Sequence, residues 1–218
     1  MGKYQTVLFD LDGTLTDPGE GITNSVAYAL AKYGIAVEDK TALYAFIGPP
    51  LIDSFRKFYS FSEEQARQAV EFYREYYRDR GMFENGVYEG IPGMLERLQA
   101  AGLTLAVATS KPEVFARQIL AHYGLDGFFA FVGGSNLDGS RTKKSEVIAY
   151  VLEACGVTDN SRALMVGDRE HDILGAKAVG IDSLGVLFGY GSREELETAG
   201  AEYLAENVCA VGEIIVAI

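Results

Sequence analysis

The chain has 218 residues, of which 48% are hydrophobic and 23% are charged, and its formal net charge is −12. This composition is typical of a globular protein and excludes a disordered or collagen-like chain. A strongly acidic chain lacks the basic face that binds nucleic acid polymers, and no apolar stretch approaches the ~20 residues of a membrane-spanning helix.

Short apolar runs that alternate with amphipathic segments fill most of the sequence. The runs predict β-strands at residues 6–10, 103–109, 129–133, 163–168 and 183–187. The segments between them predict helices at residues 93–101, 113–123, 145–154 and 173–179. Such apolar strands, separated by helices, indicate a parallel sheet covered on both faces. We therefore expect a Rossmann-like, doubly wound α/β domain.

The region between the first two predicted strands has a different character. Residues 16–89 contain helical patterns and no convincing strand. The clearest helices are expected at residues 20–33 and 65–80, with Ser62 as the N-cap of the second. Turn-forming Pro-Gly and Asn-Gly pairs mark the two expected hinges. The sequence thus predicts an α/β core of residues 1–16 and 86–218, with an α-helical cap domain of residues 17–85 inserted in it.

The first predicted strand ends in a pair of carboxylates. Asp10 and Asp12 are separated by one residue and followed by Gly13, which permits backbone angles that other residues resist. Ligands of open α/β sheets bind at the carboxyl ends of the strands. Two like charges there push one pKa up, which separates a nucleophile from a proton carrier. In isolation, however, this pattern is more often a strand that ends in an Asx turn.

Groups suited to phosphate follow the second and third predicted strands. Thr109 and Ser110 precede a helix that is expected to start near Pro112, so a hydroxyl and free N–H groups can hold phosphate oxygens there. An ordinary helix N-cap is the alternative. After the third strand, Lys143 or Lys144 could neutralise a nucleophile and a phosphoryl group, unless this segment is a solvated basic turn.

Two further carboxylates follow the fourth predicted strand. Asp168 stands at its end, and Asp172 lies one helical turn later, so both side chains can face one ion. Magnesium (Mg²⁺) favours a few carboxylates together with water and substrate phosphate. The sequence therefore predicts a magnesium site at this strand end.

Taken together, these residues resemble the haloacid dehalogenase (HAD) superfamily of aspartate-nucleophile phosphatases. The resemblance covers nearly the whole chain, and the order and separation of the motifs match. The insertion after the first strand resembles the helical cap of type-one members. The matching positions are Asp10, Asp12, Gly13 and Thr14 for the first motif, Thr109 for the second, Lys144 for the third, and Gly167, Asp168 and Asp172 for the fourth.

The resemblance implies a role for each matching residue. Asp10 would attack phosphorus, and Asp12 would protonate the leaving oxygen and then deprotonate water. The Mg²⁺ ligands would be the Asp10 carboxylate, the Asp12 main-chain carbonyl and Asp168, with Asp172 nearby. Thr109, Ser110 and Lys144 would hold the phosphoryl oxygens. Lys144 is favoured over Lys143 because related sequences show an Arg-Thr-x-Lys pattern.

The resemblance also narrows the substrate. The dehalogenase branch attacks carbon and lacks an aspartate at the position of Asp12, so phosphorus is the expected target. Residues 15–26 and 47–51 are similar to a branch of phosphoglycolate phosphatases and 5′-nucleotidases, which act on small soluble phosphomonoesters. Mutases of the β-phosphoglucomutase type share Asp12 and are the alternative.

Two further expectations concern specificity and location. Arg56 and Lys57 in the expected cap are candidates for recognising the distal part of the substrate, although ordinary solvated helix charges would look the same. No signal-peptide core precedes the first predicted strand, so we expect a cytoplasmic protein.

Overall fold

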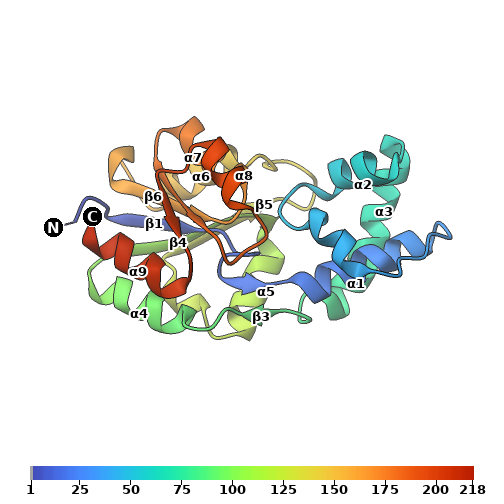
Figure 1. Cartoon of the computed structure of the whole chain (residues 1–218), viewed down its shortest axis with the longest axis horizontal. Coiled ribbons are helices and arrows are strands. Elements are labelled where there is room, and N and C mark those ends of the chain that lie inside the picture. The colour runs from blue at the N-terminus through green and yellow to red at the C-terminus, as the bar shows by residue number, and fades with distance from the viewer. Residues whose placement is uncertain (1) are drawn as a thin grey trace. The chain divides into compact units, whose positions relative to one another are not determined.

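The computed structural model describes residues 2–218, and its central feature is a six-stranded parallel sheet (Figure 1). Every pair of neighbouring strands is parallel. From one edge to the other, the strands are β5 (Phe131–Ser135), β4 (Thr104–Pro112), β1 (Thr6–Phe9), β6 (Ala163–Gly167), β7 (Asp182–Val186) and β8 (Tyr203–Ala205).

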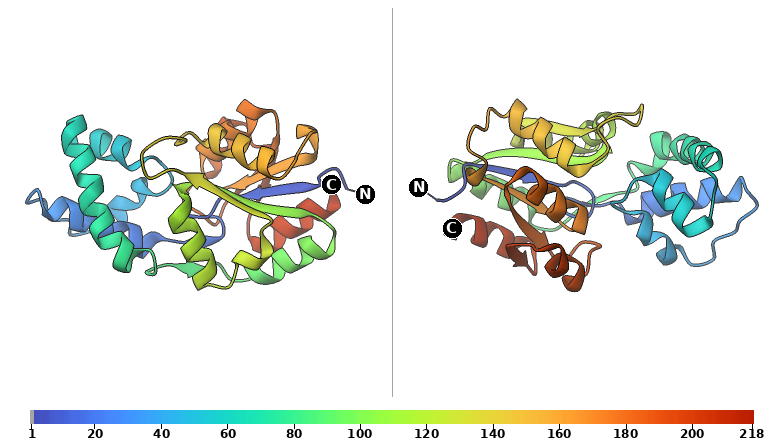
Figure 2. Two further views of the ribbon diagram at one scale, coloured as in Figure 1. Left: turned by 180° about the vertical axis from the view of Figure 1, so that it is seen from behind. Right: turned by 90° about the horizontal axis from the view of Figure 1, so that it is seen from above.

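Helices cover both faces of this sheet. On one face α6 (Lys144–Ala154) and α7 (Glu170–Val179) pack on the strands, and α8 (Arg193–Ala199) lies beside α7. The other face carries α4 (Ile91–Ala100), α5 (Glu113–His122) and α9 (Val208–Ala217), as Figures 1 and 2 show. The predicted Rossmann-like, doubly wound α/β fold is therefore confirmed. Among residues 2–218, no helix is long and apolar enough to cross a membrane.

The core of this unit lies between the sheet and its helices. Leu8 of β1 and Met165 of β6 pack with Val147 and Val151 of α6, and all four side chains are buried. Burial of an aliphatic side chain of this size contributes about 1.5–3 kcal/mol relative to exposure. The mainly apolar strands are thus held between two helical layers, which fixes where their carboxyl ends lie.

Strand β1 occupies the position at which the winding direction reverses. It pairs with β4 on one side and with β6 on the other, in register over all four of its residues. In sheets of this kind, ligands bind outside the carboxyl ends of the strands at such a switch point. The structure therefore directs attention to the residues that follow β1, β4 and β6.

Several sequence-based boundaries were wrong. Strand β4 continues through Pro112 instead of ending near residue 109, with a register shift after Ala108. Strand β8 was missed because it has three residues and is only partly buried. Residues 16–89 were expected to contain no strand, yet β2 (Thr16–Asp17) and β3 (Gly86–Val87) pair as a two-stranded sheet.

The chain divides into two compact units, one with the residues up to Thr16 and Val87–Ile218, the other with Asp17–Gly86. The first unit also contains the short 3-10 turns η3 (Asp126–Phe128) and η4 (Asn160–Arg162). The second is entirely helical apart from its ends. Its elements are α1 (Gly19–Ala31), the 3-10 helix η1 (Lys40–Phe46), α2 (Leu51–Tyr59), α3 (Glu63–Tyr76) and the π-helical turn η2 (Tyr77–Gly81).

Helix α3 shows how the second unit is specified locally. The Ser62 hydroxyl accepts the N–H of Gln65, whose side chain in turn accepts the N–H of Ser62, which is a capping box. Its expected role as N-cap is thereby confirmed. Along the same helix and the following turn, Tyr73 and Tyr77 are buried and stack at 5.1 Å between ring centroids. These two aromatic side chains belong to the core of the unit.

Candidate active site

The turn that follows β1 carries the two predicted carboxylates. Asp10 donates its backbone N–H to Val166 O of β6 at 2.9 Å, so the neighbouring strand fixes its position. The chain then folds back, with Leu11 O accepting the N–H groups of Leu15 and Thr16. Asp10 and Asp12 are both buried. Two ionisable side chains are thus held out of water within one short turn.

Gly13 allows this turn to approach β6. Its φ of +80° lies in the left-handed region that favours glycine. A Cβ at this position would lie 2.1 Å from Asp168 Oδ2, so any side chain would collide with that carboxylate. The glycine therefore lets the first and fourth motifs come into contact.

Lys144 lies at the centre of the carboxylates. Its Nζ is 2.9 Å from Asp10 Oδ1 and 2.7 Å from Asp172 Oδ1, and it donates a hydrogen bond to Ala108 O at 2.8 Å. Burial lowers the pKa of Lys144, but Asp10 and Asp172 outweigh this effect and raise it above its usual value. Lys143, in contrast, is exposed and is the N-cap of α6. Of the two lysines, the structure brings Lys144 to the carboxylates.

A second lysine, which the sequence patterns did not indicate, contacts Asp12. Lys111 Nζ donates to Asp12 Oδ2 at 2.5 Å, and both side chains are buried. Burial raises the pKa of Asp12, and although Lys111 opposes this, the net shift is upward. The available signal was a lysine two residues after a predicted apolar strand in an acidic chain. Because the strand was expected to end near residue 109, its pattern of inward-facing side chains was not extended to Lys111.

Thr109 and Ser110 lie within β4 and not at a helix N-cap as the alternative required. The Thr109 hydroxyl accepts the N–H of Lys111 at 3.2 Å and is buried. Ser110 is half-buried, and its carbonyl accepts the hydroxyl of Ser135 at 2.8 Å. The register shift of β4 falls in this stretch, where Lys111 contacts Asp12 just after β1.

Three buried carboxylates form a possible metal site. Asp10, Asp168 and Asp172 each offer an oxygen, and these oxygens lie within 4.8 Å of one another. Burial and the neighbouring carboxylates raise the pKa of Asp168 well above its usual range. Burial also raises the pKa of Asp172 to about 6, although Lys144 opposes the shift.

A buried oxygen without a hydrogen-bond partner indicates whether the three carboxylates suit a cation. Asp168 Oδ1 is buried and has no hydrogen-bond partner within residues 2–218. A buried carboxylate oxygen without a partner is costly, and a bound cation would satisfy it. Hard, oxygen-only ligands are those that Mg²⁺ prefers. The donor set therefore fits this ion.

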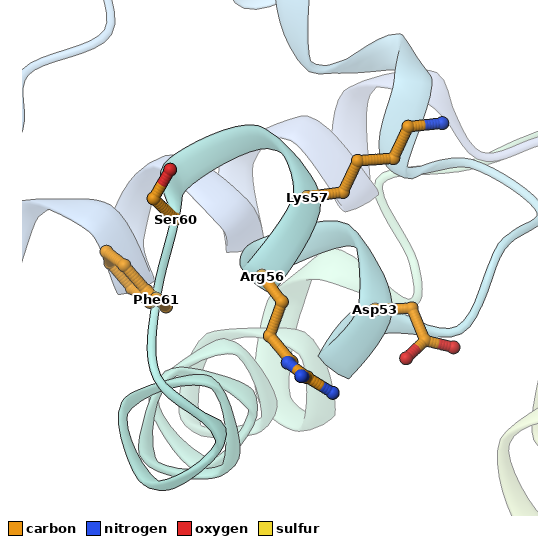
Figure 3. Close-up of a pocket in the computed structure, with 5 residues that line it drawn as sticks. All are labelled: Asp53, Arg56, Lys57, Ser60 and Phe61. Carbon is orange, nitrogen blue, oxygen red and sulfur yellow. The ribbon is translucent and has the colours of Figure 1, made fainter.

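The two candidate specificity residues lie in the other unit. Arg56 and Lys57 are exposed on α2 and line an open hollow of about 470 Å³ together with Asp53, Ser60 and Phe61 (Figure 3). In Figure 3 the Lys57 side chain extends away from that of Arg56. Both cations are therefore available to a ligand of this unit.

The sequence also matches known proteins. The family model for haloacid dehalogenase-like hydrolases matches residues 7–186, a stretch that contains all the carboxylates and lysines described above. The chain belongs to this family. This haloacid dehalogenase-like hydrolase therefore carries its charged cluster at the strand ends expected from the resemblance.

Relatives of this haloacid dehalogenase-like hydrolase include named enzymes. A 5′-nucleotidase of Pseudomonas aeruginosa is 47% identical over 98% of this chain and 96% of its own length. The tyrosine-protein kinase PtkA of Mycobacterium tuberculosis is 41% identical over 88% of this chain and 65% of its own. A phosphoglycolate phosphatase of Colwellia psychrerythraea is 28% identical, with 93% of each chain covered.

The chain is also similar to a solved structure of a protein described as a phosphatase. The crystal structure of "a predicted phosphatase" from Clostridium acetobutylicum superimposes with a TM-score of 0.96 at 48% identity, and 99% of each chain is covered. Together with the named relatives, this likeness identifies the haloacid dehalogenase-like hydrolase as an enzyme, a phosphoric monoester hydrolase.

Proposed function

We propose that this phosphatase is a Mg²⁺-dependent 5′-nucleotidase, which hydrolyses a nucleoside monophosphate through an aspartyl-phosphate on Asp10. The main support for this mechanism is that the two carboxylates of one turn have different partners and different environments. Asp10 lies 2.9 Å from Lys144, whereas Asp12 pairs with Lys111 and has a raised pKa. The proposed substrate rests on the 47% identity with a 5′-nucleotidase over nearly the full length of both chains.

Asp10 is the proposed nucleophile. Its carboxylate oxygen attacks phosphorus, the bond between phosphorus and the ester oxygen breaks, and an aspartyl-phosphate forms. The Lys144 ammonium, 2.9 Å from Asp10 Oδ1, orients this carboxylate. A covalent step of this kind divides one difficult reaction into two easier ones.

Asp12 is the proposed acid and base. Its raised pKa favours a carboxyl group that carries a proton, which it gives to the leaving oxygen. The resulting carboxylate then takes a proton from the water that attacks the aspartyl-phosphate, and inorganic phosphate leaves with Asp10 restored. Lys111, at 2.5 Å, stabilises the ionised form between the two steps.

The transferring group needs positive charge around it because the chain as a whole is acidic. Lys144, Thr109 and Ser110 are the proposed phosphate-binding residues. Mg²⁺ would be held by the carboxylates of Asp10, Asp168 and Asp172 and by the main-chain carbonyl of Asp12. When bound, the ion supplies electrostatic stabilisation of the phosphoryl charge. These groups act at short range, where screening by salt is weak.

Arg56 and Lys57 are the proposed specificity residues. A hollow lined by both cations and an aromatic side chain suits a nucleoside monophosphate, since stacking of a base on an aromatic ring is worth roughly 1–3 kcal/mol. Phe61 lines the same hollow as Arg56 and Lys57. Arg56→Ala is therefore expected to raise KM for a nucleotide more than it lowers kcat.

A substrate panel tests the proposal. Release of inorganic phosphate from AMP, other nucleoside monophosphates, phosphoglycolate and a phosphotyrosyl peptide is measured with and without EDTA. We expect the highest kcat/KM for a nucleoside monophosphate and loss of activity with EDTA. Preference for phosphoglycolate would contradict the substrate, and full activity in EDTA would contradict the metal.

The same panel separates a phosphatase from a sugar-phosphate mutase. A mutase converts a sugar phosphate with a bisphosphate activator and releases little phosphate. We expect phosphate release equal to substrate consumed. Isomerised sugar phosphate with little free phosphate would contradict the proposed hydrolysis.

A further inference from the structure

The loop that follows β7 forms a hydrogen bond with the buried carboxylate of Asp168. The backbone N–H of Tyr190 donates to Asp168 Oδ2 at 2.8 Å. This is a contact between two segments that are 22 residues apart in the sequence. Asp168 is only 1% exposed, so water does not compete for the bond.

Two glycines allow the loop backbone to approach Asp168 closely enough for this hydrogen bond. A Cβ on Gly189 would lie 2.4 Å from both Asp168 Cβ and Gly13 O, and a Cβ on Gly191 would lie 1.9 Å from Asp168 O. Real Cβ atoms do not approach other atoms this closely, so an alanine at either position must move the loop or Asp168. The Gly-Tyr-Gly sequence thus lets the backbone lie directly against the carboxylate from two sides.

The two oxygens of Asp168 consequently differ. Oδ2 accepts the Tyr190 N–H, whereas Oδ1 is buried and has no hydrogen-bond partner in the described part of the chain. Oxygens of Asp10 and Asp172 lie within 4.8 Å of an oxygen of Asp168. We propose that the loop 189–191 is a positioning element, which holds Oδ2 through the Tyr190 N–H so that Oδ1 is presented to the metal ion.

This inference rests on the proposed Mg²⁺ site. A carboxylate that is free to rotate can chelate through two oxygens or turn away, and fixing it in advance removes that loss of freedom from the cost of binding. Groups that orient metal ligands in this way commonly contribute 10–100-fold to metal affinity. The loop would act through Asp168 and without contacting the ion.

Direct metal binding by the full chain tests this role. Isothermal titration with Mg²⁺ alone compares the wild type with Gly189→Ala, Gly191→Ala and Asp168→Asn. Gly127→Ala is the matched control, because a Cβ there meets nothing within 4 Å. Unfolding temperatures are measured in EDTA, so that a general loss of stability is distinguished from a change in the site.

We expect Gly189→Ala and Gly191→Ala to remain folded and to raise the Kd for Mg²⁺ about tenfold or more. Gly127→Ala should bind Mg²⁺ as the wild type does, and Asp168→Asn should not bind measurably. Wild-type affinity in both loop variants, with binding lost in Asp168→Asn, would overturn the role of the loop and leave the proposed function intact. No binding by the wild type would overturn the Mg²⁺ site itself and this inference with it.

A measurement on the folded wild type decides the matter if the loop variants do not fold. The amide proton of Tyr190 should exchange slowly with solvent, and its NMR signal should move when Mg²⁺ is added. In Asp168→Asn the signal should no longer respond to Mg²⁺. Rapid exchange, or a signal that ignores Mg²⁺ in the wild type, would overturn the proposal.

Discussion

Lys111 Nζ lies 2.5 Å from Asp12 Oδ2, and the two side chains are only 5% and 12% exposed. Removal of the lysine leaves a buried carboxylate without its counter-ion. We expect Lys111→Met to lower kcat/KM about 100-fold, in the range found for loss of general acid–base catalysis. The measurement is phosphate release under saturating Mg²⁺. Lys177→Met, at an exposed position on α7, is the control, and equal activities would show that Lys111 has no part in the reaction.

The neighbouring lysines of the third motif make a matched pair. Lys144→Met leaves Asp10 and Asp172 buried without their shared counter-ion, a change that typically costs about 3–5 kcal/mol. Lys143→Met changes an exposed side chain and should alter stability by less than about 0.5 kcal/mol. Urea unfolding followed by turnover of the folded variants checks both effects. Greater loss in the Lys143 variant would reverse the assignment.

Asp10→Asn removes the proposed nucleophile and keeps the size of the side chain. We expect kcat to fall by about 10⁴-fold or more, since loss of a nucleophile removes the covalent route. Asp138→Asn, on an exposed turn, is the control and should retain activity. Mass spectrometry of the wild type quenched during turnover should show a phosphate adduct on Asp10. An adduct elsewhere would contradict the mechanism.

Asp182 lies at the amino end of β7, opposite the carboxyl ends that hold the candidate site, and should make the stability of the fold depend on pH. Burial raises the pKa of Asp182, but Lys3 and Tyr4, which donate to it at 2.5 and 2.6 Å, outweigh this and lower it. A lowered pKa stabilises the fold above the usual value of 3.8, and the contribution is lost as pH falls through the lower folded value.

The corresponding variant is Asp182→Asn. At pH 7 it should be less stable by up to about 1 kcal/mol, because the pair is partly exposed. The difference should shrink as pH falls below about 4. Denaturant unfolding at several pH values measures it, with Asp126→Asn as an exposed control. A difference that grows in acid would contradict the assigned direction.

The capping box of α3 offers a test of the second unit. Ser62→Ala removes the acceptor of the Gln65 N–H and should cost about 1 kcal/mol. Ser62→Asp retains an acceptor and should restore most of the stability. Thermal unfolding gives both values, and an unchanged melting temperature in Ser62→Ala would mean that the cap contributes nothing.

The sequence was sufficient to predict the fold class and the residues that follow the central strands. Asp10 and Asp168 end apolar runs that were predicted as buried parallel strands, and Asp172 follows one helical turn later, so their convergence at one edge of the sheet followed from the predicted topology. Lys144 could be chosen over Lys143 only by resemblance, because neighbouring residues at a helix start differ in direction by a rotation that a sequence does not display.

Lys111 and Tyr190 show what sequence patterns do not reveal. Lys111 lies in β4 beyond a register shift, and an irregular strand changes which side chains face inward. Tyr190 contributes a backbone N–H, so its identity carries no signal at all. The flanking glycines were the only available sign, and glycines in loops usually indicate turns.

The pairing of β2 with β3 has a consequence for how such enzymes diversify. The chain leaves the α/β unit and returns to it at adjacent positions, and Tyr88 N–H bonds to Leu15 O at 3.2 Å across this junction. Segments whose ends meet can be exchanged, lengthened or removed at little cost to the host domain. The segment Asp17–Gly86 could therefore be replaced as a whole without a change to the buried carboxylates of the α/β unit.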